Sequence, residues 1–324
     1  MVIKKSSSLS IFTGLLIIAF SIWWLHFLLM NIIFDYYSYI TYYNLIEDSE
    51  NLKESLNASR FEPGFIFISY YLSNVFSSPE AHYYFVASVC IIIKYSLFVK
   101  YIHKPILAWS LYLILFLPAL EANQIRTAIA TIFVLFMIFQ KSDNKKNYIL
   151  QSVFASLFHY VGSIIIFQSF YKKLSIFFLF LVPLILLVVS NFDSLILYFN
   201  SELLPISQFH SKVNIDNNSV NLLSSIHIAQ ISIIIFGLLN WINFSPNQKK
   251  GLFLIIIGSL LYISFVNYPP IAHRVREISL LGIFPLLFSV KIKWNLSYIL
   301  ISLSVFYITC YSVFNIVQRI LYYL

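Results

Sequence analysis

Apolar runs separated by short polar segments make up most of the chain. Several runs approach the roughly 20 residues that an α-helix needs to cross the hydrocarbon core of a bilayer, and others are shorter. The pattern predicts an all-α fold, a polytopic transmembrane helical bundle with about 9 to 11 membrane segments, some of them re-entrant or broken. The apolar runs occupy residues 9–30, 64–76, 83–99, 106–120, 127–139, 148–170, 174–192, 224–242, 252–266, 278–290 and 296–317.

The composition excludes a soluble globule. Of the 324 residues, 60% are hydrophobic and 10% are charged, and no core of that size could remove so much apolar surface from water. The net charge of +8 would suggest a nucleic-acid partner in a soluble protein, but the lysines cluster in short loops, as the positive-inside rule predicts for cytoplasmic loops. We therefore expect residues 1–324 to form a single integral membrane domain that contacts the lipid bilayer and no nucleic acid.

Two apolar runs do not fit a simple series of crossings. Lysine-bearing loops on one side of a membrane must be separated by an even number of crossings, and the spacing of the lysine clusters breaks this parity. One solution makes 64–76 a re-entrant segment and 148–170 a hairpin of two half-helices around His159, since broken backbone at membrane depth is tolerated where it lines a cavity. The other solution places two lysine-bearing loops outside.

Arg126 stands between two apolar runs, in a segment that the first solution places at the external face. A guanidinium keeps its charge, and burying it at the centre of a helix in lipid costs about 2.5 to 3.5 kcal/mol. The neighbouring Asn123 and Gln124 indicate a polar pocket between helices that could bind an anionic ligand. The alternative is an arginine that reaches to lipid headgroups.

A second pair of arginines follows the rigid turn Pro269-Pro270. The positive-inside rule disfavours arginines on an external segment, and Arg274 and Arg276 lie on one. They therefore indicate either an anion site or contact with lipid headgroups. Glu277 could bind substrate or hold Arg274 in place as an ion-pair partner.

The first external segment, 31–63, carries Asp35 and Tyr39 at its start and Arg60 and Glu62 at its end. Aromatic faces and carboxylates bind sugars, and a carboxylate can act as a general base on a sugar hydroxyl. The alternative is a membrane-interface belt of tyrosines with solvated charges. His159 lies inside an apolar run, where it either hydrogen-bonds to a neighbouring helix or acts as an acid or base.

The sequence contains no Walker loop, no Gly-rich dinucleotide fingerprint, no Ser nucleophile elbow and no Cys–His cluster. The remaining histidines lack the spacing of a metal site. These absences argue against an ATPase, a dehydrogenase, a hydrolase or a metalloenzyme. We expect neither a cofactor nor a metal.

Five short motifs follow one another along the chain: Asp35-Tyr36 with Tyr39, Glu62-Pro63-Gly64-Phe65, Asn123 with Arg126 and Ala130, Phe158-His159-Tyr160, and Arg274 with Glu277 followed by Pro285. In order and context these motifs resemble the EpsG branch of the Wzy-type bacterial polysaccharide polymerases. The sequence departs from the family pattern at Thr127, Val161 and Gly162. Arg126 and Arg274 fit the family pattern best.

The resemblance implies a glycosyltransferase that joins undecaprenyl-pyrophosphate-linked oligosaccharide repeat units on the outer side of the bacterial cytoplasmic membrane. Its product would be an O-antigen, capsule or exopolysaccharide, and a flippase and a chain-length regulator would be further partners. Arg126 with Arg274 or Arg276 would neutralise the departing pyrophosphate. The base would be Asp35, Glu62 or His159, and the substrate-binding residues would be Glu62, Arg60, Arg276, Glu277, Asn123, Gln124 and Tyr39.

Other readings stay open at this point. Asp35 in a first external loop also fits a polyprenyl-phosphate-dependent membrane glycosyltransferase, although such chains are usually longer. A flippase for lipid-linked oligosaccharides would bind the same pyrophosphate, but it should show two corresponding halves, which are not evident. A scaffold role is disfavoured because buried arginines are costly.

Overall fold

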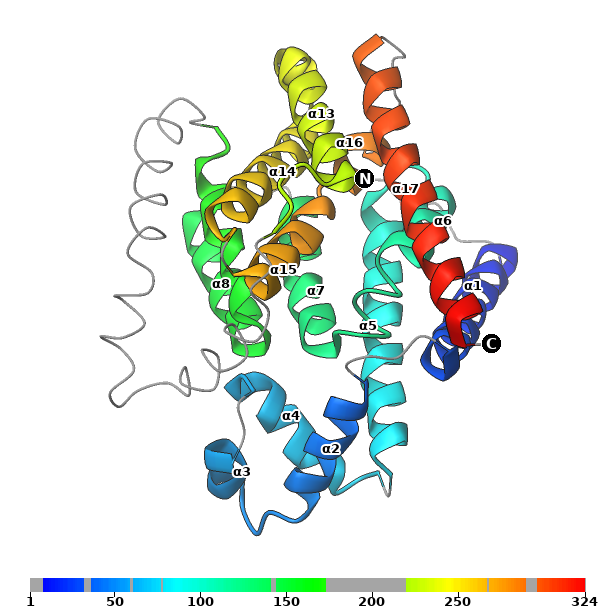
Figure 1. Ribbon diagram of the computed structural model, residues 1–324, viewed down its shortest axis with the longest axis vertical. Coiled ribbons are helices and arrows are strands. Elements are labelled where there is room, and N and C mark those ends of the chain that lie inside the picture. The colour runs from blue at the N-terminus through cyan, green and yellow to red at the C-terminus, as the bar shows by residue number, and fades with distance from the viewer. Residues whose placement is uncertain are drawn as a thin grey trace.

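The computed structural model describes residues 8–31, 36–58, 61–76, 78–140, 144–172, 220–266, 268–289 and 296–323. Within these ranges the regular structure is entirely helical, which confirms the all-α prediction. In chain order the helices are α1 Ser8–Asn31, α2 Tyr36–Glu47, α3 Leu52–Ala58, α4 Pro63–Ser73, α5 Pro79–Tyr101, α6 Pro105–Leu115, α7 Ile125–Phe139, α8 Lys145–Phe158, the 3-10 helix η1 Tyr160–Phe170, α13 Ser225–Leu239, the 3-10 turn η3 Trp241–Asn243, α14 Pro246–Ser264, α15 Pro269–Leu280, α16 Ile283–Phe288 and α17 Leu296–Tyr323 (Figure 1).

Proline marks the start of many of these helices. α4, α5, α6, α14 and α15 each begin with proline, whose fixed φ suits the first helical turn and whose missing N–H would have had no helical partner there. α14 adds a capping box in which Ser245 and Gln248 bond to each other's backbone N–H groups. These local signals divide the apolar sequence into separate helices.

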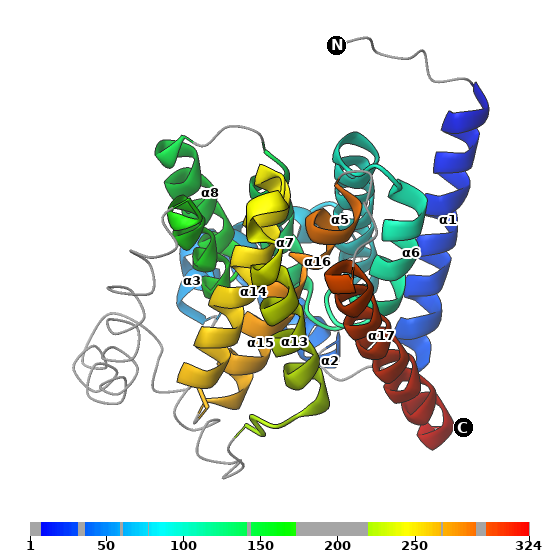
Figure 2. The same cartoon turned by 90° about the horizontal axis from the view of Figure 1, so that it is seen from above.

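Three helices in the described part of the chain are long and apolar enough to cross a membrane, over Phe12–Met30, Pro79–Tyr101 and Leu296–Leu321. α1 and α17 expose many large apolar side chains, as expected of helices that face lipid. Both views place these two helices on the same side of the molecule (Figures 1 and 2). The chain is therefore a membrane protein.

The other expected membrane segments form shorter helices or lie outside the described residues. Apolar helices of intermediate length are α6, α7, η1 and α13. The run expected at 106–120 ends its helix at Leu115 and continues as an irregular linker to Gln124. The run expected at 174–192 lies outside the described residues.

The hairpin predicted around His159 is present. α8 ends at Phe158, His159 adopts an extended backbone conformation, and η1 follows at once. The two arms pack against each other, and the Ser152 hydroxyl donates to the Ser163 carbonyl oxygen at 3.1 Å. The break therefore places His159 at the tip of a helical hairpin.

The predicted re-entrant run 64–76 forms the short helix α4, which packs beside α2, α3, α5 and α8. Figure 1 shows α2, α3 and α4 grouped at one end of the molecule. A Cβ on Gly64 would lie 2.7 Å from the Leu157 carbonyl oxygen, so glycine allows the start of α4 to reach the end of α8. Its depth in the membrane stays a prediction.

α14 lies at the centre of the fold and contacts α7, α13, α15, α16 and η1. Its side chains are buried on all sides from Gly251 to Ser259, which is typical of an interior helix. A Cβ on Gly258 would lie 2.0 Å from the Cβ of Ser279, so glycine permits the close approach of α14 to α15.

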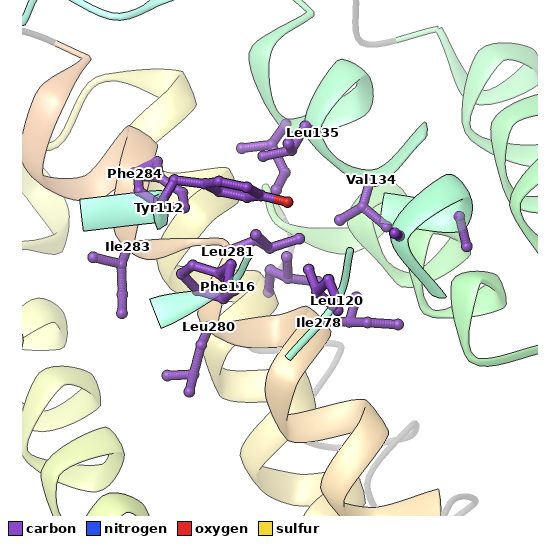
Figure 3. Close-up of a cluster of buried hydrophobic side chains, with 14 of the residues drawn as sticks. Tyr112, Phe116, Leu120, Val134, Leu135, Ile278, Leu280, Leu281, Ile283 and Phe284 are labelled. Carbon is purple, nitrogen blue, oxygen red and sulfur yellow. The ribbon is translucent and has the colours of Figure 1, made fainter. Parts of the chain in front are cut away.

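A cluster of buried apolar side chains joins α6 and its linker to α7, α15 and α16. Figure 3 shows Tyr112 and Phe116 facing Phe284, with Leu120 beside Ile278. The Phe116 and Phe284 rings lie 5.3 Å apart between centroids. This packing holds the linker before α7 against the helices that follow α14.

Candidate functional site

An ion pair between Arg126 and Glu62 forms the centre of the candidate site. Arg126 Nη1 donates to Glu62 Oε2, and Arg126 Nε donates to the Tyr39 hydroxyl at 3.3 Å. The guanidinium also lies over the Phe61 ring, 4.1 Å from its centroid, in a cation–π contact. The side chains of Arg126 and Glu62 retain 20% and 14% exposure, so the pair is largely removed from solvent.

Helix starts position both partners. Glu62 is the N-cap of α4, where the helix dipole stabilises a carboxylate. Arg126 lies in the first turn of α7, directly after the N-cap Gln124 and Ile125. Gly64 brings the start of α4 against the end of α8, so segments distant in sequence meet at Arg126.

A second carboxylate and a second arginine lie beside this pair on α15. Gln124 Nε2 donates to Glu277 Oε2 at 3.1 Å. Arg274 Nη1 lies 3.9 Å from the same Glu277 oxygen, one helical turn away. Gln124 therefore links the start of α7 to α15, where Glu277 is an ion-pair partner of Arg274.

His159 lies at the hairpin tip, within electrostatic range of both arginines. Its Nδ1 accepts from the Val161 backbone N–H at 3.3 Å, and its ring lies 4.6 Å from the Tyr160 ring. Arg126 and Arg274 both act electrostatically on His159, and Glu62 acts on Tyr160. The hairpin tip thus belongs to the same charged cluster as α4, α7 and α15.

The structure brings together most of the residues expected from the sequence. Arg276 is different: it lies two positions after Arg274, on nearly the opposite face of α15, and lines another cavity. Asn123 is half-buried in the linker before α7. Asp35 and Arg60 lie outside the described residues. The residues of the cluster are Tyr39, Glu62, Gln124, Arg126, His159, Arg274 and Glu277.

The sequence reading did not single out Lys94, which lies in the middle of α5 and is fully buried. Lys94 Nζ forms an ion pair with Glu121 Oε1 at 2.6 Å, and the Tyr112 hydroxyl donates to the same oxygen at 2.7 Å. The Tyr83 hydroxyl donates to the Glu121 backbone oxygen at 2.9 Å. The sequence signal for this pair is Lys94 itself, a charged residue inside an apolar run.

Lys94 and Glu121 act on the site through the backbone. They anchor the linker between α6 and α7 against α5, and this linker leads directly to Gln124 and Arg126. The ion pair and hydrogen bonds of Lys94 and Glu121 involve no residue of the charged cluster, so the pair supports the linker before α7 and not the cluster directly.

The cluster combines fixed positive charge with carboxylate and amide oxygens. Two guanidinium groups suit a ligand with several anionic oxygens, since their N–H donors match phosphate geometry. The two carboxylates can accept hydroxyl protons or hydrogen bonds. Among the described residues, no group of three or more His, Cys, Asp or Glu side chains could hold a metal ion.

Comparison with known proteins matches the chain to a protein family. The model of the EpsG family matches residues 12–324, nearly the whole chain and every residue of the cluster. No curated protein and no solved structure matches the chain.

Proposed function

The chain belongs to the EpsG family of Wzy-like polysaccharide polymerases, and we propose that it joins oligosaccharide repeat units linked to undecaprenyl pyrophosphate. We place this reaction at the external face of the bacterial cytoplasmic membrane. The observation that carries the proposal is the meeting of two Arg–Glu pairs, Arg126–Glu62 and Arg274–Glu277, beside the hairpin tip.

The proposed reaction transfers the growing chain from its lipid to a new repeat unit. A hydroxyl oxygen of the acceptor sugar attacks the anomeric carbon of the donor, and the bond from that carbon to the pyrophosphate oxygen breaks. The hydroxyl proton passes to a protein base, and undecaprenyl pyrophosphate leaves with the bonding electrons. The donor already carries its leaving group, so the protein's task is to orient both sugars and to stabilise the developing negative charge.

Arg126 and Arg274 are proposed to bind the pyrophosphate. In the structure their charges are balanced by Glu62 and Glu277. A diphosphate that draws Arg126 toward itself frees the Glu62 carboxylate, which is then the base for the acceptor hydroxyl. In this proposal the arginines exchange their carboxylate partners for the diphosphate when substrate binds.

His159 is proposed to donate to the substrate rather than to act as the base. Its Nδ1 accepts the Val161 N–H, so the proton of the neutral imidazole is on Nε2. An Nε2–H group beside two guanidinium groups suits hydrogen bonding to an anionic or sugar oxygen.

The neighbouring side chains are proposed to hold the sugars. Phe61 and Tyr39 offer aromatic surface next to Arg126, and their ring centroids are 5.6 Å apart. Gln124 and Glu277 offer amide and carboxylate oxygens to sugar hydroxyls. The product would be an O-antigen, capsule or exopolysaccharide, made together with a flippase and a chain-length regulator.

The test replaces the chromosomal gene by variants and resolves the surface polysaccharide as a ladder on gels. We expect Arg126→Ala and Arg274→Ala to lower polymer formation about 100-fold or more at normal membrane protein level, because each removes a donor to the leaving group. Arg126→Lys should restore little, since a point charge cannot bind two oxygens side by side. Lys53→Ala, an exposed lysine on α3, is the matched control and should give normal ladders.

Normal ladders in both arginine variants would remove this site from the reaction. Purified protein that moves the lipid-linked unit across vesicles but forms no polymer would instead support the flippase reading.

A further inference from the structure

A separate cavity of about 600 Å³ lies on the face of α15 that carries Arg276. α13, α14, α15, α17 and the segment before α13 all contribute to its lining. Arg276 brings a permanent positive charge, and Ser224, Tyr262 and Tyr311 bring hydroxyl groups. The volume is in the range of pockets that enclose a small-molecule ligand or its head group.

Arg276 is held in place without a carboxylate. Its Nη1 donates to the Tyr262 hydroxyl at 3.2 Å, and its guanidinium lies 4.9 Å from the centroid of that ring. Its Nη2 lies 3.2 Å from His273 Nδ1. Within the described ranges, carboxylates pair with Arg126 and Arg274 but none pairs with Arg276. Its charge is therefore available to an anionic ligand.

The state of His273 agrees with this picture. Partial desolvation, followed by the nearby Arg276 and Arg274 guanidinium groups, lowers the pKa of His273 to about 4. The imidazole is therefore neutral at pH 7, so its Nδ1 can accept from Arg276. At that pH Arg276 supplies the positive charge of the pair.

The first turn of α13 adds a second anion-binding feature. Ser224, Ser225 and Ile226 line the cavity at the start of this 15-residue helix. Ser224 is the N-cap, but its side chain makes no capping bond, and its buried Oγ has no hydrogen-bond partner among the described residues. The helix dipole and the first N–H groups favour a negatively charged group at this position.

An apolar groove continues from the cavity between α13 and α17. It has a volume of about 430 Å³ and shares Ser225 with the cavity. Ile228, Phe236 and Leu303 are among its lining residues. Ile228 and Leu303 are 49% and 56% exposed, so the groove is open to the side, where a lipid chain could enter.

We infer that the cavity and the groove together bind an isoprenoid diphosphate lipid, with the diphosphate at Arg276 and the hydrocarbon chain between α13 and α17. The inference rests on the proposed function, because a reaction between two lipid-linked substrates requires places for two diphosphates. The Arg126–Arg274 site takes one, and the Arg276 cavity takes the other. The two sites lie on different faces of α15, which keeps the two anions apart.

Titration of the purified full chain in detergent with farnesyl diphosphate tests this inference. We expect two binding sites per chain, of which Arg276→Ala weakens one by about tenfold or more, the usual effect of losing a charged hydrogen bond. Lys249→Ala is the matched control, since this lysine lies near the opposite end of α14 from Tyr262, and it should leave both sites intact.

A second variant tests the groove. Ser304 lines it on α17, and Ser304→Trp should weaken farnesyl diphosphate at the Arg276 cavity while inorganic pyrophosphate still binds there. Ser304→Ala, which keeps the space, should bind both as the native chain does.

Unchanged binding in Arg276→Ala would overturn the inference. So would equal competition by phosphatidylglycerol in nanodiscs, which would identify an ordinary headgroup site. The result is separable from the polymerase proposal: normal ladders in Arg126→Ala would remove the first site from the reaction, while the titration of Arg276→Ala would still decide the second.

Discussion

Arg126 at the start of α7 donates to the carboxylate of Glu62 at the N-cap of α4, across 64 positions of sequence. The pair is charge-balanced and largely buried, with 20% and 14% of the two side chains exposed. It holds α4 against α7, and in the proposed function Arg126 also binds an anionic substrate.

A charge swap separates these roles. Arg126→Glu alone places two carboxylates together and should cost about 3 kcal/mol or more of stability, because a buried charge is left unpaired. The double variant Glu62→Arg with Arg126→Glu should recover much of the thermal stability in detergent, yet form no polymer, since the cation has moved to α4. Recovery of polymer ladders in the double variant would show that the pair acts only as a structural contact.

The buried Lys94–Glu121 pair predicts a strong effect on stability. Lys94→Met leaves the Glu121 carboxylate uncompensated in the interior and should cost about 3 to 5 kcal/mol. The double variant Lys94→Met with Glu121→Met removes both charges and should regain most of this loss. Thermal unfolding of the purified single and double variants measures both changes in stability. A single variant as stable as the native chain would contradict the pairing.

Gly64 predicts a positional effect on activity. Alanine at this position places its Cβ 2.7 Å from the Leu157 carbonyl oxygen, a backbone atom that cannot move aside without shifting the end of α8. We expect Gly64→Ala to separate Glu62 from Arg126 and to shorten the polymer ladder at normal protein level. Gly14→Ala is the matched control, because its Cβ would meet Tyr95 at an ordinary 3.7 Å. If Gly64→Ala and Gly14→Ala are equally active, the close approach of α4 to the end of α8 is not needed for activity.

Gly258 predicts a stability effect with a specific rescue. Gly258→Ala brings its Cβ to 2.0 Å from the Ser279 side chain and should destabilise the contact of α14 with α15 by about 1 to 3 kcal/mol. Ser279→Gly in the same chain removes the clashing atoms and should restore part of the thermal stability. Because α15 carries both Arg274 and Arg276, Gly258→Ala should also weaken farnesyl diphosphate binding. If Ser279→Gly restores no stability, the destabilisation by Gly258→Ala does not come from contact with the Ser279 side chain.

The sequence alone determined the class of fold, and it indicated the break at His159 as one of two solutions. The apolar runs are local properties of the chain, so they predict helices without knowledge of packing. The hairpin was one of two solutions to the parity of the lysine loops, which is read from the order of charged and apolar segments along the whole chain. The proline starts of α4, α5, α6, α14 and α15 are likewise readable from the chain.

The tertiary structure decided which charges meet. Arg274 and Arg276 are equivalent in the sequence, but two positions on a helix turn side chains to nearly opposite faces, so one joins Arg126 and the other faces a second cavity. The ion pair of Lys94 with Glu121 depends on the packing of α5 against the linker before α7. Contacts between residues far apart in sequence depend on how helices pack, and apolar helices without a distinct polar face do not encode that arrangement in their local pattern.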